Sequence, residues 1–460
     1  MGIISLVTTL SIFTAFSSVV YQAYVASNEL KKVTSTISSL MYTENAINAE
    51  YLKKIAVGFG GYRNIYVKFT DFLNVTETHK NDHIKNLFAS FASSFSRGQG
   101  SEYIVERQTF EYLVQKAQTI QEPVILMNVG AIGIATRLAE EQQSVLLAAK
   151  ISKDLYTRLN SQIQLSEEDF AVEDNVCLIL EYKKDEIWGS LKSSSANSFI
   201  LFSECNIAEK GSIPKFSSIV QNFIPRLIIV TGLEVFKLNI NSLQTQLKNL
   251  PNSTLIHLHI PIYVANKSFL DVILTFGNSL SMNEQSLYKL QKDLNIKDST
   301  ISTETANEIT RNLDIIRIVF FNLYHRQTEK NTRKLSRIHV HSISFQIIMT
   351  VKSFGWRNTK HGIVKAALRA ARHSCGTETL NPGSFFINKN NEFYKSYEPP
   401  LEKIKIRENE AVSCWTENMK INFELIELEF CVVVNLICRN TMQTSGLEEN
   451  VLADALILQI

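Results

Sequence analysis

The segment Leu227-Ile-Ile-Val-Thr-Gly232 decides the fold class, because it is a short, continuous apolar run that glycine closes. Such a run predicts a strand that is buried on both faces. Amphipathic stretches, for example Thr109–Ile120 and Asp154–Gln164, lie between similar runs elsewhere in the chain. Strands that alternate with helices predict an α/β fold, a doubly wound parallel sheet with helices on both faces and ligands at the carboxyl ends of its strands. The similar runs are Lys53–Phe59, Val124–Asn128, Val145–Ala149 and Thr254–His259.

One further region predicts antiparallel strands, and another predicts a run of strands. Val176–Tyr182 and Ser198–Phe202 are apolar runs on either side of a charged turn at Lys183–Glu186. A second strand-rich region, residues 403–438, includes Met419–Ile426. Runs that a short polar turn joins are typical of hairpins. We therefore expect antiparallel strands in addition to the parallel sheet.

The composition is that of a globular protein with no strong electrostatic field. Of the 460 residues, 45% are hydrophobic and 20% are charged, which is typical of a folded chain. The net charge is only +2, from 47 Lys and Arg against 45 Asp and Glu, so we expect no nucleic-acid partner. Glycine is scarce, with 17 residues, so the chain can supply few glycine-rich phosphate loops.

The first 28 residues indicate a secretory leader. No charged residue precedes Glu29, and Leu6–Val25 is apolar with interleaved Ser and Thr. Its length is close to the roughly 20 residues that span a bilayer. We therefore expect a signal peptide or signal anchor at residues 1–28, a membrane anchor within residues 6–25, and the rest of the chain in the endoplasmic reticulum lumen or secretory pathway. The alternative is a buried N-terminal helix.

The segment after the leader, residues 29–52, is polar and helix-compatible, and we expect a linker there. Three glycosylation sequons follow, at Asn74, Asn252 and Asn266, although such triplets are common by chance. The cysteines leave two interpretations open: one or two disulfides in a secretory compartment, or buried thiols. None forms a CxxC pair, so a zinc ribbon is not expected. The six are Cys177, Cys205, Cys375, Cys414, Cys431 and Cys438.

One long motif resembles a known family. The stretch Leu178–Lys192 resembles the lid strands of eukaryotic ADP-dependent glucokinases. Leu335–Ser342 and Ser374–Leu380 are similar to other segments of that family, and Thr444–Val451 falls where the family carries its Gly-x-Gly-Asp signature. Order and spacing agree from about Lys53 to the C-terminus.

The resemblance implies a ribokinase-like fold at residues 53–460, with a smaller β-rich lid near residues 61–115 and 172–203. The implied reaction is transfer of the β-phosphoryl group of ADP to the 6-hydroxyl of glucose, with Mg²⁺, giving glucose 6-phosphate and AMP. The implied partners are a small-molecule sugar and ADP, bound by a monomer. A disulfide between Cys375 and Cys438 is implied too, because both match cysteine positions of the family.

The resemblance places the anion site and the catalytic base at the start of a C-terminal helix. Glu449 aligns with the catalytic Asp, and Glu448 aligns with the second glycine of the signature. A glutamate keeps the carboxylate but moves it by one methylene, and Glu448 puts negative charge where backbone must approach phosphate. The alternative is a surface helix that starts with acidic residues. The other residues expected to bind phosphate or nucleotide are Ser445, Gly446, Leu447 and His339.

The residues expected at the sugar are Gly60, Asn64, Gly130 and Glu181. Asn64 stands at a family carboxylate position, and it can donate a hydrogen bond but cannot supply a charge-assisted one.

The resemblance places the metal at His259, Asn283 and Ser286. Ser286 stands where the family has a glutamate, and Mg²⁺ prefers hard oxygen ligands, so we expect weak binding or none. His257 with His259, and His339 with His341, are strand-face pairs that could instead suggest a transition metal.

Two classes of function follow. The first is an ADP-dependent glucokinase whose reaction is weak or lost, because several motif elements are replaced together. The second is a non-catalytic pseudokinase, or a lumenal binding or regulatory protein that uses the same cleft. An assay with ADP, Mg²⁺ and glucose separates the two.

Overall fold

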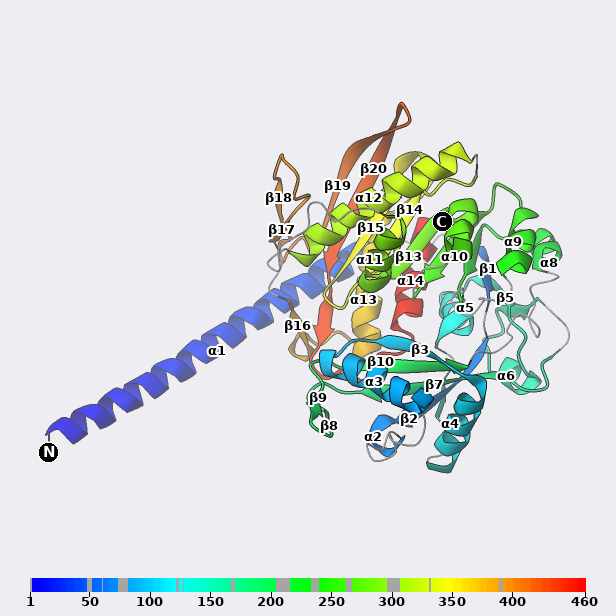
Figure 1. Ribbon diagram of the computed structural model, residues 1–460. Helices are drawn as coiled ribbons and strands as arrows, with labels where there is room; N and C mark the ends of the chain where they lie inside the picture. The colour runs from blue at the N-terminus through cyan, green and yellow to red at the C-terminus, as the bar shows by residue number, and fades with distance from the viewer. Residues whose placement is uncertain are drawn as a thin grey trace.

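Most of the chain is placed in the computed structural model, and the described residues form two large sheets, three two-stranded sheets, their covering helices and a projecting N-terminal helix (Figure 1). The residues that the structure describes are 2–47, 52–59, 61–72, 82–120, 124–126, 128–166, 170–203, 216–232, 240–261, 267–295, 307–330, 332–388 and 392–460.

The larger sheet has ten strands in the order β19-β20-β15-β14-β13-β12-β11-β1-β5-β6. The pairs from β14 to β6 are parallel, and β15, β20 and β19 add an antiparallel edge. The apolar run Leu227–Val230 forms β11, which pairs in parallel with β1 on one side and β12 on the other, so the expected parallel sheet is confirmed. The strands are β1 (Lys54–Gly58), β5 (Ser144–Ala148), β6 (Ile163–Leu165), β11 (Leu227–Val230), β12 (Leu255–Ile260), β13 (Ser279–Asn283), β14 (Arg337–His341), β15 (Phe345–Val351), β19 (Val412–Ile421) and β20 (Glu424–Val434).

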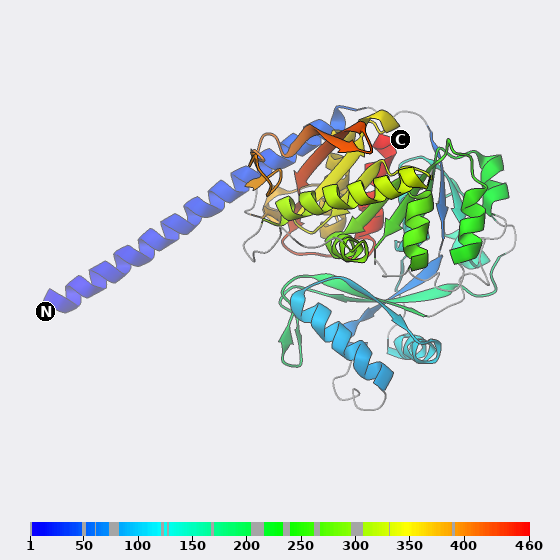
Figure 2. The same cartoon turned by 45° about the horizontal axis from the view of Figure 1, so that its top comes forward.

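Helices cover both faces of this sheet, as a continuous apolar strand pattern requires (Figure 2). Alternate residues along β11 enter different cores: Ile228 packs with one helix layer and Ile229 with the other. The first layer contains α8 (Phe216–Phe223), α9 (Ile240–Lys248), α10 (Lys267–Phe276), α11 (Glu284–Asp293) and α12 (Glu308–Glu329). The second contains α5 (Gly130–Glu140), α6 (Lys153–Thr157), α13 (Thr359–Cys375) and α14 (Leu447–Gln459).

The smaller sheet, which we call the lid, has five strands in the order β3-β10-β7-β2-β4. Phenylalanines of its helices pack on one face, and the other face turns toward the large sheet (Figure 2). The predicted antiparallel pair is confirmed as β7 and β10. The elements are β2 (Tyr62–Lys68), α2 (Phe69–Phe72), α3 (Asp82–Arg97), β3 (Ser101–Val105), α4 (Arg107–Ile120), β4 (Val124–Leu126), β7 (Asn175–Tyr182), β8 (Ile187–Trp188), β9 (Leu191–Lys192) and β10 (Asn197–Ser203).

One predicted strand belongs to the other sheet. The run at Val124–Asn128 was expected in the parallel sheet, but β4 pairs antiparallel with β2 in the lid. A short apolar run predicts burial but does not say which sheet provides it. The strand-rich region 403–438 is confirmed: it contains β18 (Lys403–Lys405), β19, β20 and β21 (Leu436–Cys438), and the first and last of these pair with β17 (Glu392–Tyr394) and β16 (Phe385–Ile387), respectively. The run Met419–Ile426 is not one strand, because the tight turn at Asn422 and Phe423 divides it between β19 and β20.

The N-terminal helix α1 (Gly2–Asn45) projects from the body as a long rod (Figure 1). Its last part packs beside α13 through Val33, Ile37 and Leu40, and Arg372 donates to both carboxylate oxygens of Glu44 at 3.0 and 2.9 Å. The segment expected as a linker is therefore helical and attached as far as Asn45. Among the helices that the structure describes, none is long and apolar enough to cross a membrane, so the expected membrane anchor finds no support.

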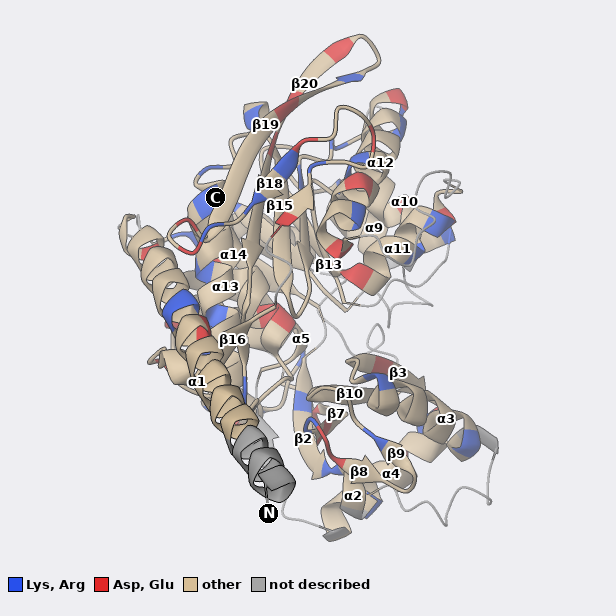
Figure 3. Ribbon diagram, turned by 90° about the vertical axis from the view of Figure 1, so that its left-hand side faces the viewer, with Lys and Arg blue, Asp and Glu red and all other residues tan. Residues whose placement is uncertain are grey.

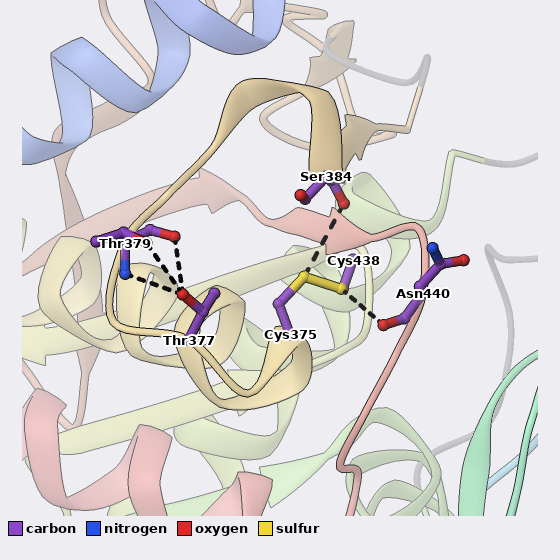
Figure 4. Close-up of a disulfide and its surroundings, with 6 residues drawn as sticks. All are labelled: Cys375, Thr377, Thr379, Ser384, Cys438 and Asn440. Atoms are coloured by element: carbon purple, nitrogen blue, oxygen red, sulfur yellow. Dashed lines mark hydrogen bonds between the residues drawn. A yellow bond between two sulfur atoms is a disulfide. The ribbon is translucent and has the colours of Figure 1, made fainter.

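Two disulfides occur among the described residues. The implied pair is confirmed: Cys375 at the end of α13 is bonded to Cys438 at the end of β21, with Cα atoms 5.6 Å apart (Figure 4). A second disulfide joins Cys414 and Cys431, which face each other across β19 and β20 with Cα atoms 4.2 Å apart. Cys177 is buried and unbonded. Cys205, the sixth cysteine, lies outside the described residues, as do the sequons Asn74 and Asn266.

Candidate functional site

A cleft of about 820 Å³ lies between the lid and the carboxyl ends of β13 and β14. Over the ribbon as a whole, basic and acidic segments are interspersed rather than gathered into one region of a single sign (Figure 3). This is the edge at which open parallel sheets bind ligands. The polar and helix-start residues that line the cleft include Lys183, Lys184, Asn283, Ser286, His341, Thr444, Ser445, Gly446, Leu447, Glu448 and Glu449.

The N-terminus of α14 forms the floor of the cleft, and Gly446 fixes its position. Gly446 is the N-cap with a φ of 76°, a left-handed conformation that side chains rarely adopt. A Cβ atom there would collide with the carbonyl oxygen of Asn128, so backbone touches backbone. No side chain caps the helix, so its first-turn N–H groups are the natural donors for an anion.

Glu449, the expected catalytic base, is 7% exposed at this helix start. Its Oε1 accepts a hydrogen bond from the Gly130 N–H at 2.7 Å. Burial raises the pKa of Glu449 to about 7, opposed by the Gly130 bond and supported by the nearby Glu448 carboxyl. The group is thus a carboxyl that loses its proton near neutral pH, with one oxygen already bonded to the protein.

Glu448 lies in the cleft and not on an open surface, which excludes the surface-helix alternative. Its side chain keeps 31% exposure, Asn283 Nδ2 donates to its Oε1 at 3.3 Å, and its Oε2 lies 3.9 Å from Nε2 of His341. Burial raises its pKa to about 7, while the bond from Asn283 lowers it. Two carboxyls therefore lie at the N-terminus of α14, which lines the cleft.

Ser445, which precedes Gly446, joins the lid to the large sheet. Oε1 of Glu181 on β7 accepts from the Ser445 N–H at 3.1 Å and from its hydroxyl at 2.9 Å. The hydroxyl also bonds to the Tyr66 hydroxyl on β2. The Ser445 carbonyl accepts from Asn128 Nδ2 at 3.0 Å and from His373 Nε2 at 2.8 Å. Every polar atom of this residue is thus used, and it is 1% exposed.

The residues expected at the sugar lie around the contact between the lid and the start of α14. Asn64 is fully buried and donates to Asn128 Oδ1 at 3.3 Å, and Gly130 begins α5 beneath Glu449. Neither lines the cleft, whereas Glu181 reaches its wall through Ser445. Gly60 lies outside the described residues.

The expected metal ligands do not fit a Mg²⁺ site. His259 is fully buried, its Nδ1 bonds to Ser281 at 2.9 Å, and burial lowers its pKa to about 3. The side-chain oxygen of Asn283 caps α11 by accepting from the Ser286 N–H, and the Ser286 hydroxyl donates to the carbonyl of Pro261. Within the described part of the chain, no group of three or more His, Cys, Asp or Glu could hold a metal ion, and the histidine pairs form no such group either.

His339, which was expected at the nucleotide, lies inside the sheet and not at the cleft. His339 is fully buried, and its Nε2 bonds to Gln346 at 3.1 Å inside the sheet. His341 is the last residue of β14, where the cleft opens, so it lines the cleft and His339 does not. Tyr66 and His373 were not predicted, because a single polar side chain outside a motif gives no signal of its own.

Comparison with known proteins decides the family. A family model described as "ADP-specific Phosphofructokinase/Glucokinase conserved region" matches residues 53–458. The chain belongs to this family. The ADP-dependent glucokinase of Bos taurus is 24% identical over 88% of this chain and 84% of its own length. A probable ADP-dependent glucokinase of Caenorhabditis elegans is 22% identical over 88% and 85%.

Solved structures of similar fold confirm the ribokinase-like architecture. An ADP-dependent kinase in complex with fructose-6-phosphate and ADPβS has a TM-score of 0.60 at 12% identity, covering 93% of this chain and 97% of that one. A hypothetical ADP-dependent phosphofructokinase from Pyrococcus horikoshii gives 0.53 at 14% identity, covering 88% and 97%. At these identities the likeness shows the fold alone.

Proposed function

We propose that this protein binds ADP and glucose in the cleft but transfers the phosphoryl group far more slowly than a relative with an intact Gly-x-Gly-Asp signature. The observation that carries the proposal is the position of the Glu448 carboxyl at the uncapped N-terminus of α14. A phosphoryl group needs the N–H groups there, and a carboxylate in the same place repels it.

The rest of the site supports a slow reaction. Phosphoryl transfer depends mostly on positioning and on electrostatic stabilisation of the transferred group. Glu449 offers a base whose pKa lies close to neutral, but one of its oxygens is bonded to Gly130. The residues that would hold Mg²⁺ are bonded to one another and to backbone instead, so they are not available as a ligand set, and the positive charge in the cleft comes from side chains such as Lys183 and Lys184.

A purified full-length chain assayed with ADP, Mg²⁺ and glucose tests the proposal, with a glucokinase that keeps the signature as the positive control. We expect turnover near the uncatalysed background. The double variant Glu448→Gly with Glu449→Asp should recover little, because the substituted sugar and metal positions remain. A wild-type turnover within the usual ~1–1,000 s⁻¹ would refute the proposal.

A binding or regulatory protein is the second candidate, and the retained cleft favours it. Calorimetric titration with ADP separates the candidates: binding without turnover is the signature of a pseudokinase.

We further propose that the chain resides in the secretory pathway. The two disulfides support this placement, because such bonds persist mainly in oxidising compartments.

A further inference from the structure

We propose that Thr444 and Ser445 form an internal latch, whose hydroxyl and amide groups occupy the lid carboxylate Glu181 until a sugar displaces them. The inference rests on the proposed function only in taking a sugar as the competing ligand. Ser445 would then be a residue that sets sugar affinity from within the chain.

The latch is a set of four hydrogen bonds on one oxygen. Oε1 of Glu181 lies 3.1 Å from both the Thr444 and the Ser445 nitrogens, 3.3 Å from the Thr444 hydroxyl and 2.9 Å from the Ser445 hydroxyl. Hydrogen bonds to a charged acceptor are stronger than neutral ones. Glu181 comes from β7 of the lid, and Thr444 and Ser445 lead into α14 of the large domain. The bonds therefore hold the two parts together.

Two of the four donors to Glu181 are hydroxyls, the kind of donor that a sugar presents, and the other two are backbone N–H groups. The Ser445 hydroxyl is a primary alcohol, and the Thr444 hydroxyl is a secondary one, as sugars carry. The Tyr66 hydroxyl, a second lid group, also bonds to the Ser445 hydroxyl. A sugar that entered the cleft could exchange one set of hydroxyl donors for another at little net cost.

The latch residues can be reached by a ligand. Thr444 and Ser445 both line the cleft, although little of Ser445 is exposed. On the opposite side, the Ser445 carbonyl stays bonded to His373 on α13, so release of Glu181 would leave this segment attached to the large domain. Its other partner, Asn128, is bonded to Asn64 and Tyr66 of the lid as well. The lid can therefore part from Ser445 without loss of the α14 start.

The test compares glucose affinity by calorimetry in the full-length wild type and in Ser445→Ala. Loss of one hydroxyl from a charged acceptor should make glucose bind about tenfold more tightly, because the internal competitor is weaker. The matched control is Ser344→Ala, a cleft-lining serine whose hydroxyl accepts from Asn388, and its affinity should not change. A merely structural serine would give equal or weaker binding in Ser445→Ala, and that result overturns the latch. Damage to the fold cannot imitate a gain in affinity.

A ligand-free measurement separates failure of the latch from failure of the proposed function. Hydrogen–deuterium exchange at the Thr444 and Ser445 amides should be slow in the wild type and at least about tenfold faster in Glu181→Ala, which removes their acceptor. If neither protein binds glucose, the sugar site of the proposed function is refuted. The internal contact of the latch then stands if these amides are released by Glu181→Ala, whereas its displacement by a sugar falls with the sugar site, and the latch is refuted whole if their exchange does not change.

Discussion

The two disulfides differ in the length of chain that they enclose, and this difference predicts a ranking of stability. Cys375 and Cys438 are 63 residues apart, and Cys414 and Cys431 are 17 apart. A disulfide lowers the entropy of the unfolded chain more when its loop is longer, which gives about 4 kcal/mol for the first and about 3 kcal/mol for the second. The expected difference is about 1 kcal/mol.

This difference can be expressed as a melting temperature. Unfolding entropy is about 2.1 cal/mol/K per residue, so a family region of about 400 residues loses roughly 1 °C for each 0.8 kcal/mol. The double variant Cys375→Ala with Cys438→Ala should then melt about 5 °C below the wild type. The variant Cys414→Ala with Cys431→Ala, which serves as the matched control, should melt about 4 °C below it.

Scanning calorimetry of the three proteins without reductant measures both shifts. The reasoning holds if each pair costs several degrees and the longer loop costs more. It is refuted if the 17-residue pair costs clearly more than the 63-residue pair, because loop entropy could not then be the main term.

Two other expectations concern the charge of Glu449 and the cellular location of the chain. Glu449→Gln should stabilise the protein by about 3 kcal/mol at pH 8 and by nothing below pH 4.5. The reason is that the folded pKa of about 7 exceeds the ordinary value of 4.5, so the buried ionised form costs stability as the pH rises between these two values. Urea unfolding at both pH values measures the gain, with exposed Glu427→Gln as the control, and an equal gain at both pH values would contradict this reasoning. Glycosidase treatment should change the gel mobility of the expressed wild type. The change should be smaller for Asn252→Gln, because Asn252 lies at an exposed turn before β12. The proposed secretory location fails if the mobility of the wild type does not change and the protein fractionates with the cytosol.

The sequence predicted the sheet well because its signal is local. Continuous apolar runs such as β11 and β12 must be buried on both faces, and a parallel sheet between helix layers is the arrangement that does this. The same signal could not assign β4 to its sheet, since Val124–Leu126 is apolar in either place. The difference between the two sheets depends on contacts with β2, which lies far away in the sequence.

The site was less predictable, because its polar residues act through long-range pairs. The motif at Thr444–Val451 located the helix start, but it did not show that Ser445 meets Glu181 or that Asn128 lies beneath Gly446. His339 and His341 have the same residue type and strand face, and only the end of β14 shows that His341 alone reaches the cleft. Such pairings depend on how the two sheets meet, which no local pattern records.

The way in which α1 is attached has a consequence for processing. Its side chains from Phe13 to Lys32 are exposed apart from half-buried Val25, and the buried contacts begin at Val33. A protease that cut near Ala26 or Ser27 would thus remove no fully buried side chain among these residues, and the ion pair of Glu44 with Arg372 would remain. At 1.5 Å per residue, the exposed stretch from Phe13 to Lys32 extends roughly 30 Å from the body. The folded body and the projecting part of α1 are therefore mechanically separable.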